Sequence, residues 1–490
     1  MIDVGYGVFL AAAALAVGVL ALLWRGGALE LADLGGRSRP PAARWARGRD
    51  LAPLRVSSAQ ATRLTLGRLG RGLLAARERE SVIVFGPTVT HKTSGLAIPA
   101  LLEWQGPVLA TSVKSDLLAV TLTPRKALGE VMVFDPAQVT GVPSARATPL
   151  RGAGSWAGAL EVAHWLANAA RSSAGGLSDA DFWYAAAEKL LAPLLYAAAS
   201  SERTMEAVVR WLDEGPEANE AKIEALLGET GEPAALRAYR ATQNREERQR
   251  SSVYTTAEMI VGVFADPRVA AETAAADYTP ERLLDGRANT LYLCAPRQQQ
   301  ERLQPLFSLL VAELMAEVEA RELARKRPLD PPLLLLLDEC ANIAPVPALD
   351  EIASTAAGQG VQLLTVFQDM AQVRSRYGTR AATIVNNHRA KLFGTAISDA
   401  ETLTYVSRLL GAGEFEQRSS STSSGERGHH SETQGDTYRE LAPSHVVRER
   451  EPGTALLVHG HLPPARIRLR PWYGDRSLRK LAAACGKESW

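Results

Sequence analysis

Short apolar runs, each bounded by glycine, proline or aspartate, recur along the chain. Three of them, at 81–86, 107–112 and 130–135, precede its middle, and a helical apolar periodicity at 93–104 separates the first two. Strand, helix and strand in this order predict a parallel sheet. Five more runs follow at 290–295, 333–338, 362–367, 390–395 and 454–460. The predicted fold class is α/β, with a doubly wound, mostly parallel sheet.

The stretch from about 155 to 275 has a different pattern. It is rich in alanine, shows helical periodicity and contains no strand-like run, and residues 181–199 form its clearest helix. We interpret it as an all-α domain inserted into the α/β domain. Residues 414–438 are polar and of low complexity. Such a composition cannot supply a packed core, so we predict a disordered loop there.

The N-terminal residues 4–24 carry no charge. As a helix, about 20 apolar residues span roughly 30 Å of hydrocarbon. Asp3 precedes this run and Arg25 follows it, whereas a cleaved secretory signal has positive charge first and a small-residue cleavage site after. We therefore predict a retained single-pass anchor, with a cleaved signal or a buried helix of a soluble domain as alternatives.

Every positive residue between 25 and 80 is an arginine. The positive-inside rule then places the large C-terminal part in the cytoplasm. Arginines beside a membrane span are explained by anionic lipid and membrane topology, with DNA contact as an alternative. We expect the end of this segment, 61–80, to be partly helical.

Charge and cysteine content narrow the function classes further. The formal net charge of the 490 residues is +1, so the whole protein is not an obvious binder of polyanions. Its three cysteines, Cys294, Cys340 and Cys485, are widely spaced and form no metal-binding or disulfide pattern. This usage is typical of a reducing compartment.

Residues 85–95, FGPTVTHKTSG, nearly match a phosphate-binding loop. The usual pattern is Gly, four residues, then Gly-Lys-Ser/Thr, placed between a buried strand and a helix. The strand and helix are both predicted here, and only the second glycine is replaced, by His91. In such a loop, backbone N–H groups and the lysine bind phosphates. The candidate nucleotide-binding residues are Gly86, Pro87, Thr88, Val89, Thr90, His91, Lys92, Thr93 and Ser94.

The other half of a nucleotide site needs an acid at the end of a second buried strand. The run PPLLLLLDEC supplies Asp338 and Glu339. We predict that Thr93 and Asp338 hold Mg²⁺, that Lys92 neutralises the phosphates of ATP and that Glu339 activates the attacking water. The alternative is that Asp338 and Glu339 only end a strand and that Lys92 is only a cation at a helix start.

His91 has three interpretations. It can be a tolerated substitution with the imidazole turned outward, because histidine accepts left-handed backbone better than β-branched residues do. It can contact phosphate directly. It can also cripple hydrolysis, since a side chain there costs about 1–3 kcal/mol if the backbone is strained.

The order of these motifs resembles the type IV secretion coupling proteins, the TraG/TraD-like ATPases of conjugation, and is most similar to their actinobacterial branch. The similarity extends over residues 1–475. It is carried by GPTVTHKTSGLAIPALLEWQGPVLATSVKSDLL, VMVFDP, DFWYAAAEKLLAPLLYAAA, LLLLLDECANIAPVPALDEI, GVQLLTVFQDMAQVRSRYG, AKLFGTAISDAETLTYVSRLLG and RELAPSHVVREREPGTALLVHGHLPPARIRLRPWY. Each block is weakly specific alone, and their order and spacing carry the resemblance.

The resemblance implies a RecA-like motor domain, a cytoplasm-facing all-α domain, a homo-hexamer, and ATP-driven handling of DNA with a relaxase at a type IV secretion channel. It assigns a catalytic role to Gln368, with capping of a strand end as the alternative. Lys114 and Asp116 become candidates for an interface or phosphate-near role, or for a surface ion pair. Asn342 either orients the water at Glu339 or caps a helix.

The predicted division of the chain combines these observations. It comprises an anchor at 1–24, an arginine-rich juxtamembrane segment at 25–80, a nucleotide-binding domain at 81–150 and 280–475 that contains the loop 414–438, an all-α domain at 151–279, and a tail at 476–490.

The chain departs from the family pattern at three points. His91 replaces glycine. Ala357 stands where some members carry an arginine finger, which leaves Arg374, Arg376 and Arg389 as candidates. One membrane span is visible where many relatives have two. Two rival functions remain: a membrane docking platform without hydrolysis, favoured by His91 and Ala357, and an FtsK-type double-stranded DNA translocase, which usually carries a winged helix after its motor.

Overall fold

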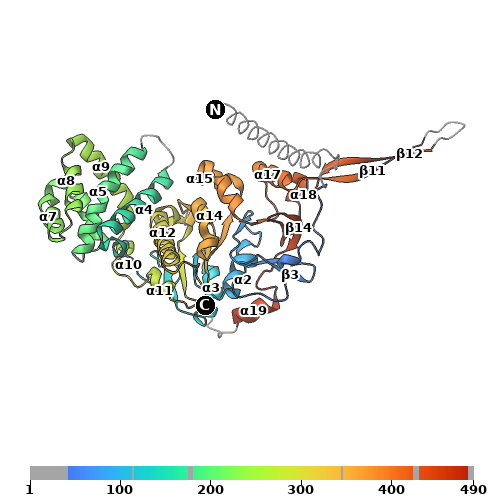
Figure 1. The fold of residues 1–490 in the computed structure, drawn as a ribbon, viewed down its shortest axis with the longest axis horizontal. Helices are drawn as coiled ribbons and strands as arrows, with labels where there is room; N and C mark the ends of the chain where they lie inside the picture. The colour runs from blue at the N-terminus through green and yellow to red at the C-terminus, as the bar shows by residue number, and fades with distance from the viewer. Residues whose placement is uncertain (1–41, 113–114, 175–179, 344–345, 423–429, 484–490) are drawn as a thin grey trace, which may run out of the picture. The chain divides into compact units, whose positions relative to one another are not determined.

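The computed structural model describes residues 42–112, 115–174, 180–343, 346–422 and 430–483 (Figure 1). All eight apolar runs are strands, as predicted. They are β4 (Val82–Phe85), β5 (Val108–Ser112), β6 (Val131–Phe134), β7 (Thr290–Cys294), β8 (Leu333–Leu337), β9 (Val361–Phe367), β10 (Ala390–Phe393) and β13 (Thr454–His459). The leucines of β8 are completely buried, which explains why this strand reads as an unbroken apolar run.

One large sheet contains these strands together with β1 (Arg55–Val56), β2 (Thr65–Leu69), β3 (Gly72–Ala75) and β14 (Leu462–Arg468). Its strand order is β1-β3-β2-β14-β13-β10-β4-β9-β8-β5-β7-β6. From β10 to β6 all neighbouring strands pair in parallel, and from β10 back to β1 all pair antiparallel. The α/β class with a mostly parallel sheet is therefore confirmed. β4, which precedes the candidate phosphate loop, lies in the sheet interior between β9 and β10.

The partly helical prediction for 61–80 is wrong. This segment contains the hairpin of β2 (Thr65–Leu69) and β3 (Gly72–Ala75), and β1 (Arg55–Val56) pairs with β3. Gly70 at the turn has a φ of 58°, which glycine adopts without strain. The predicted boundary at 80 therefore falls inside the sheet, because part of the arginine-rich segment belongs to its antiparallel half.

The helices that lie next to strands of the sheet in the sequence include two groups, and within each group the helices pack against one another. One group is α2 (Ile98–Glu103), α3 (Ser115–Lys126) and α19 (Arg476–Ala483). The other is α12 (Gln300–Arg325), α14 (Leu349–Gln359) and α16 (Ala381–Asn387). The predicted helix after the phosphate loop begins as a π-helical turn, η2 (Thr93–Ala97), which continues into α2.

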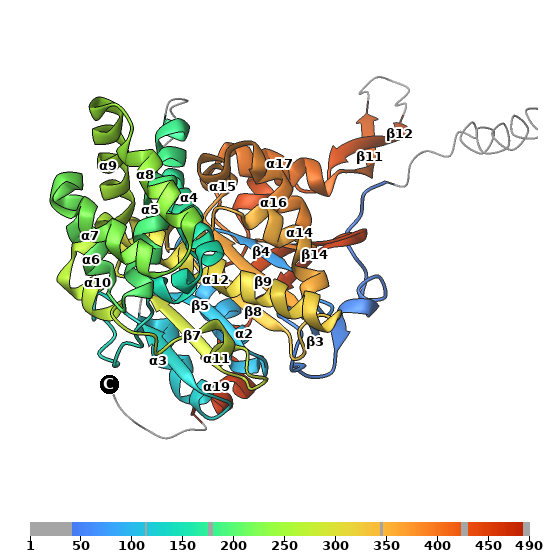
Figure 2. The same ribbon diagram turned by 60° about the vertical axis from the view of Figure 1, so that its left-hand side comes forward.

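Between β6 and β7 the chain is helical, and Figure 2 shows these helices, in green, grouped together. They include α4 (Trp156–Ala174), α5 (Ala180–Ser200), α6 (Met205–Asp213), α7 (Gly215–Glu229), α8 (Pro233–Gln243), α9 (Glu247–Val261) and α10 (Pro267–Glu272), and α11 (Pro280–Leu283) follows before β7. The contacts between residues place these helices and the sheet in one compact unit. This unit comprises 45–411 and 442–490. Their long member α5 covers the predicted helix 181–199.

Residues 412–441 belong to a second unit and differ from the predicted disordered loop. β11 (Ala412–Thr422) and β12 (His430–Glu440) pair antiparallel along their whole length. Backbone hydrogen bonds between the strands need no apolar core, so a polar serine- and threonine-rich sequence can form this hairpin. The predicted anchor at 4–24 lies outside the described residues, and none of the helices within them is long and apolar enough to cross a membrane.

Candidate nucleotide-binding site

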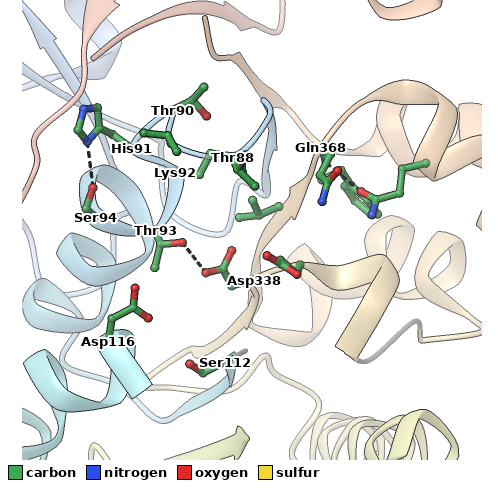
Figure 3. Close-up of a pocket in the computed structure, with 15 residues that line it drawn as sticks. Thr88, Thr90, His91, Lys92, Thr93, Ser94, Ser112, Asp116, Asp338 and Gln368 are labelled. Carbon is green, nitrogen blue, oxygen red and sulfur yellow. Dashed lines mark hydrogen bonds between the residues drawn. The ribbon is translucent and has the colours of Figure 1, made fainter. Parts of the chain in front are cut away.

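The carboxyl ends of β4, β8 and β9 meet at one edge of the sheet. Because β9 pairs in parallel with both β4 and β8, the loops that follow these three strands leave on the same side. Together with the end of β5 and the start of α3, these loops enclose a cavity of about 320 Å³ (Figure 3). Its lining comprises Thr88, Val89, Thr90, His91, Lys92, Thr93, Ser94, Ser112, Asp116, Asp338, Glu339, Val366, Phe367, Gln368 and Gln372.

The loop after β4 curls around the ammonium group of Lys92. The Lys92 Nζ donates hydrogen bonds of 2.5 Å to the carbonyl oxygens of Gly86 and Pro87. Thr90 Oγ1 also donates to the Pro87 carbonyl, at 2.8 Å. A side chain at Gly86 would bring a Cβ within 2.8 Å of that Oγ1, so the tight loop requires glycine there. Burial lowers the pKa of Lys92, and the negative charges of Asp338 and Glu339 oppose this shift.

Thr93 and Asp338 form the contact that joins the two halves of the site. Thr93 Oγ1 donates a 2.7 Å hydrogen bond to Asp338 Oδ2 across the cavity, as Figure 3 shows. Burial raises the pKa of Asp338 to about 6, and the Thr93 hydrogen bond acts against this rise. A hydroxyl and a carboxylate are hard oxygen donors that suit Mg²⁺, which takes few protein ligands and keeps several waters. The two predicted metal ligands therefore fit the ion.

Glu339 belongs to a chain of polar contacts that the sequence revealed only in part. Asn342 Nδ2 lies 3.4 Å from Glu339 Oε2, and Gln372 Nε2 lies 3.4 Å from Asn342 Oδ1. Gln372 Oε1 in turn accepts from the backbone N–H of Gln368 at 2.9 Å. Asn342 thus contacts the predicted catalytic carboxylate. Gln372 was missed, although its position four residues after Gln368, on α15 (Met370–Tyr377), is a detectable signal.

The same chain extends away from the cavity. Gln304 Nε2 donates to the Asn342 carbonyl at 2.8 Å, and Arg376 donates to Gln304 Oε1 at 3.0 Å. Arg376, one of the candidates for an arginine finger, is therefore hydrogen-bonded within the same chain. The other two form ion pairs, Arg374 with Glu401 and Arg389 with Glu80.

His91 sits in left-handed backbone, with a φ of 60°. Its Nδ1 lies 3.2 Å from both Ser94 Oγ and Tyr473 Oη. Figure 3 shows the imidazole directed away from Asp338 and Gln368. This orientation matches the outward interpretation and not the direct phosphate contact. Val89, also left-handed with a φ of 67°, is 92 % exposed at the loop tip.

The two remaining candidate residues, Asp116 and Lys114, have different outcomes. Asp116 lines the cavity, and its Oδ1 accepts from the backbone N–H of Leu117 at 2.9 Å. Lys114 lies outside the described residues. Sequence reasoning did not single out Ser112 or Tyr473, because nothing in their local sequence distinguishes them.

Comparison with known proteins identifies a family over most of the chain. Residues 54–488 match the family model described as "Type IV secretory system Conjugative DNA transfer". The chain is 26 % identical over 427 residues to protein VirD4 of Agrobacterium fabrum, covering 82 % of this chain and 60 % of that protein. It is 25 % identical over 367 residues to the conjugal transfer protein TraG of Escherichia coli, covering 68 % and 55 %. The chain thus matches a little over half the length of these curated relatives.

Solved structures with the same fold include two of the plasmid coupling protein TrwB. In complex with ADP and Mg²⁺, TrwB has a TM-score of 0.64 at 17 % identity, over 88 % of this chain and 94 % of that one. An unbound form gives 0.63 at 16 % identity, over 88 % and 95 %.

Proposed function

Because the chain belongs to the type IV secretory system conjugative DNA transfer family, we propose that it is a coupling protein that binds ATP with Mg²⁺ and uses hydrolysis to drive DNA transfer. The observation that carries this proposal is the convergence of the phosphate loop with Asp338 and Glu339 on one cavity. These residues come from strands far apart in the sequence, and a structural role alone does not require them to meet.

Each residue has a distinct part in the proposed mechanism. The backbone N–H groups of the loop and the Lys92 ammonium bind the phosphates. Thr93 and Asp338 hold Mg²⁺, which when bound neutralises developing phosphate charge. Glu339 orients the attacking water and accepts its proton, and Asn342 fixes the direction of the carboxylate. Gln368 also lines the cavity, and its proposed role is to contact the terminal phosphate or the water.

The wider assembly extends the proposal. The uncharged run 4–24 followed by arginines supports a single-pass anchor with the large part in the cytoplasm. The helices α4–α10 are proposed as the all-α domain. A homo-hexamer, a relaxase-bound DNA substrate, secretion-channel components and inner-membrane lipid are the proposed partners. TraG is named as a conjugal transfer protein, and TrwB as a conjugative coupling protein, which supports this assignment.

Two substitutions test the proposal. Lys92→Ala removes the phosphate counter-charge and should abolish nucleotide binding. Glu339→Gln should keep ATP bound and lower turnover by about 10²–10⁴-fold, because water activation alone is lost. The exposed Lys126→Ala and Glu319→Gln are matched controls that should behave like the parent. Binding is measured by calorimetry and turnover by phosphate release, with and without single-stranded DNA.

The outcomes separate the rival function from the proposed one. Parent-like turnover in Glu339→Gln would show that this residue is not the water-activating group. A parent protein that binds ATP but hydrolyses none under any DNA condition would favour the docking platform, which the histidine in the loop and Ala357 support.

A further inference from the structure

The segment 469–478, here called the C-terminal strap, crosses the helix that follows the phosphate loop. The Trp472 N–H donates to the Ser94 carbonyl at 2.9 Å. A Cβ on Gly95 would lie 3.2 Å from Leu469 Cβ, so the strap and the first turn of the helix are in close contact. The strap therefore reaches the phosphate loop itself.

Buried charges fix the strap in place. Arg470, whose side chain is 3 % exposed, donates to Glu103 at 2.8 Å and to Asp475 at 3.0 Å. Asp475 also pairs with Arg68 at 3.1 Å, and Thr65 donates to Glu103 at 2.7 Å. These contacts tie the strap to α2 and to the β2 strand.

Tyr473 projects from this fixed strap and stays 51 % exposed. Its hydroxyl lies 3.2 Å from His91 Nδ1, and the two ring planes are inclined at 60°, with centroids 6.4 Å apart. A half-exposed aromatic ring on a rigid support loses little conformational entropy on binding another flat group. The ring is thus pre-organised beside the loop.

The site geometry fixes the side on which a nucleoside leaves the loop. Thr93, Asp338 and Glu339 hold the metal and the water, so the terminal phosphate lies on their side. The rest of the nucleotide must extend the other way, past Ser94. Figure 3 shows Ser94 and His91 on the side of Thr93 opposite to Gln368, and Tyr473 contacts His91 there.

We propose that Tyr473, braced by His91, is the platform on which the base of the bound nucleotide stacks. The inference rests on the proposed nucleotide binding and adds the subsite for the base. Stacking on an aromatic face makes no hydrogen bond to the edge of the base, so it does not distinguish one base from another. The platform therefore favours any purine nucleoside triphosphate over a bare phosphate chain, with little choice between adenine and guanine.

The test compares two probes on the full chain in the presence of Mg²⁺: ATP and inorganic tripolyphosphate. Tyr473→Ala should weaken ATP binding by about 5- to 150-fold, the range for loss of one stacked base, and leave tripolyphosphate binding unchanged. Tyr473→Phe keeps the ring and should bind ATP within about threefold of the parent. Thermal unfolding of both variants checks that the fold persists.

Three results would overturn the inference. Equal weakening of ATP and tripolyphosphate by Tyr473→Ala would mean that the strap acts on the loop and not on the base. Unchanged ATP binding in Tyr473→Ala would show that the base lies elsewhere. A parent chain that binds neither probe would remove the proposed function itself, a failure distinct from the other two.

Discussion

The ion pair between Arg470 and Glu103 gives a stability prediction that the structure makes quantitative. Both side chains are buried, 3 % and 4 % exposed, and lie 2.8 Å apart. Arg470→Met keeps much of the side-chain volume but leaves the Glu103 carboxylate without its charged partner. Removing one member of a buried pair costs about 3–5 kcal/mol, because the other charge stays desolvated. Thr65 still donates to Glu103, so we expect a loss near the lower end.

Urea denaturation of the parent and variants measures this loss. Removing both charges, in Glu103→Leu combined with Arg470→Met, should recover a large part of it, since the unpaired Glu103 charge is gone and Asp475 keeps Arg68 as its partner. The exposed pair of Arg146 and Asp277, 2.7 Å apart with side chains 48 % and 43 % exposed, provides the control. Arg146→Met should change the free energy of unfolding far less than Arg470→Met does, because solvent screens the exposed pair.

Two outcomes would refute this reasoning about the buried pair. The first is a loss below about 1 kcal/mol for Arg470→Met, the value expected of a solvated surface pair. The second is a double variant whose loss equals the sum of the two single losses, because independent sites add and a coupled pair does not.

Three further predictions concern the loop, the active-site chain and a buried acid. His91→Gly relieves left-handed strain of about 1–2 kcal/mol and should leave turnover at saturating ATP unchanged; a tenfold fall would mean that the imidazole reaches the reacting phosphate. Gln372→Ala should lower kcat but not ATP affinity, because Asn342 loses the hydrogen bond that Gln372 donates to it. Gln372→Glu cannot donate that hydrogen bond, so its kcat should be lowered as well. Burial raises the pKa of Glu313 from 4.5 to about 8. Between these two pH values the folded state keeps a proton on Glu313 that the unfolded state has released. The free energy of unfolding should therefore fall as pH rises through this range. Glu313→Gln should flatten that dependence in denaturation at pH 5.5 and 8, whereas the exposed Glu319→Gln should not.

The central strands were predictable because burial on both faces forces an unbroken apolar run, as in the leucines of β8. The strands of the antiparallel half of the sheet were not predictable from the local sequence. β14 (Leu462–Arg468) begins with Pro463 and Pro464 nearby, which count against a strand. β2 contains Gly67 and Arg68, and its polar positions hide it among arginine-rich sequence. Such strands follow from pairing with distant neighbours, which the local pattern does not contain.

The candidate site likewise contains residues that the sequence located and contacts that it did not predict. Spacing within one loop and one strand end located Lys92 and Asp338 from the sequence alone. The contact of Tyr473 with His91 joins positions 382 residues apart, and the chain from Gln304 to Asn342 joins two helices. Their side chains are ordinary in isolation and acquire a role only when the fold brings them together.

The place of β4 in the sheet has a consequence for biosynthesis. β4 pairs with β9 and β10, and the strap reaches the loop from beyond residue 468. A nascent chain therefore carries its phosphate loop for some 300 residues of translation before the neighbouring strands exist. Pairings so distant in sequence form slowly and leave apolar strands exposed to chaperones. Nucleotide stabilises the species that binds it, so ATP favours the completed fold over chains in which these strands are still unpaired.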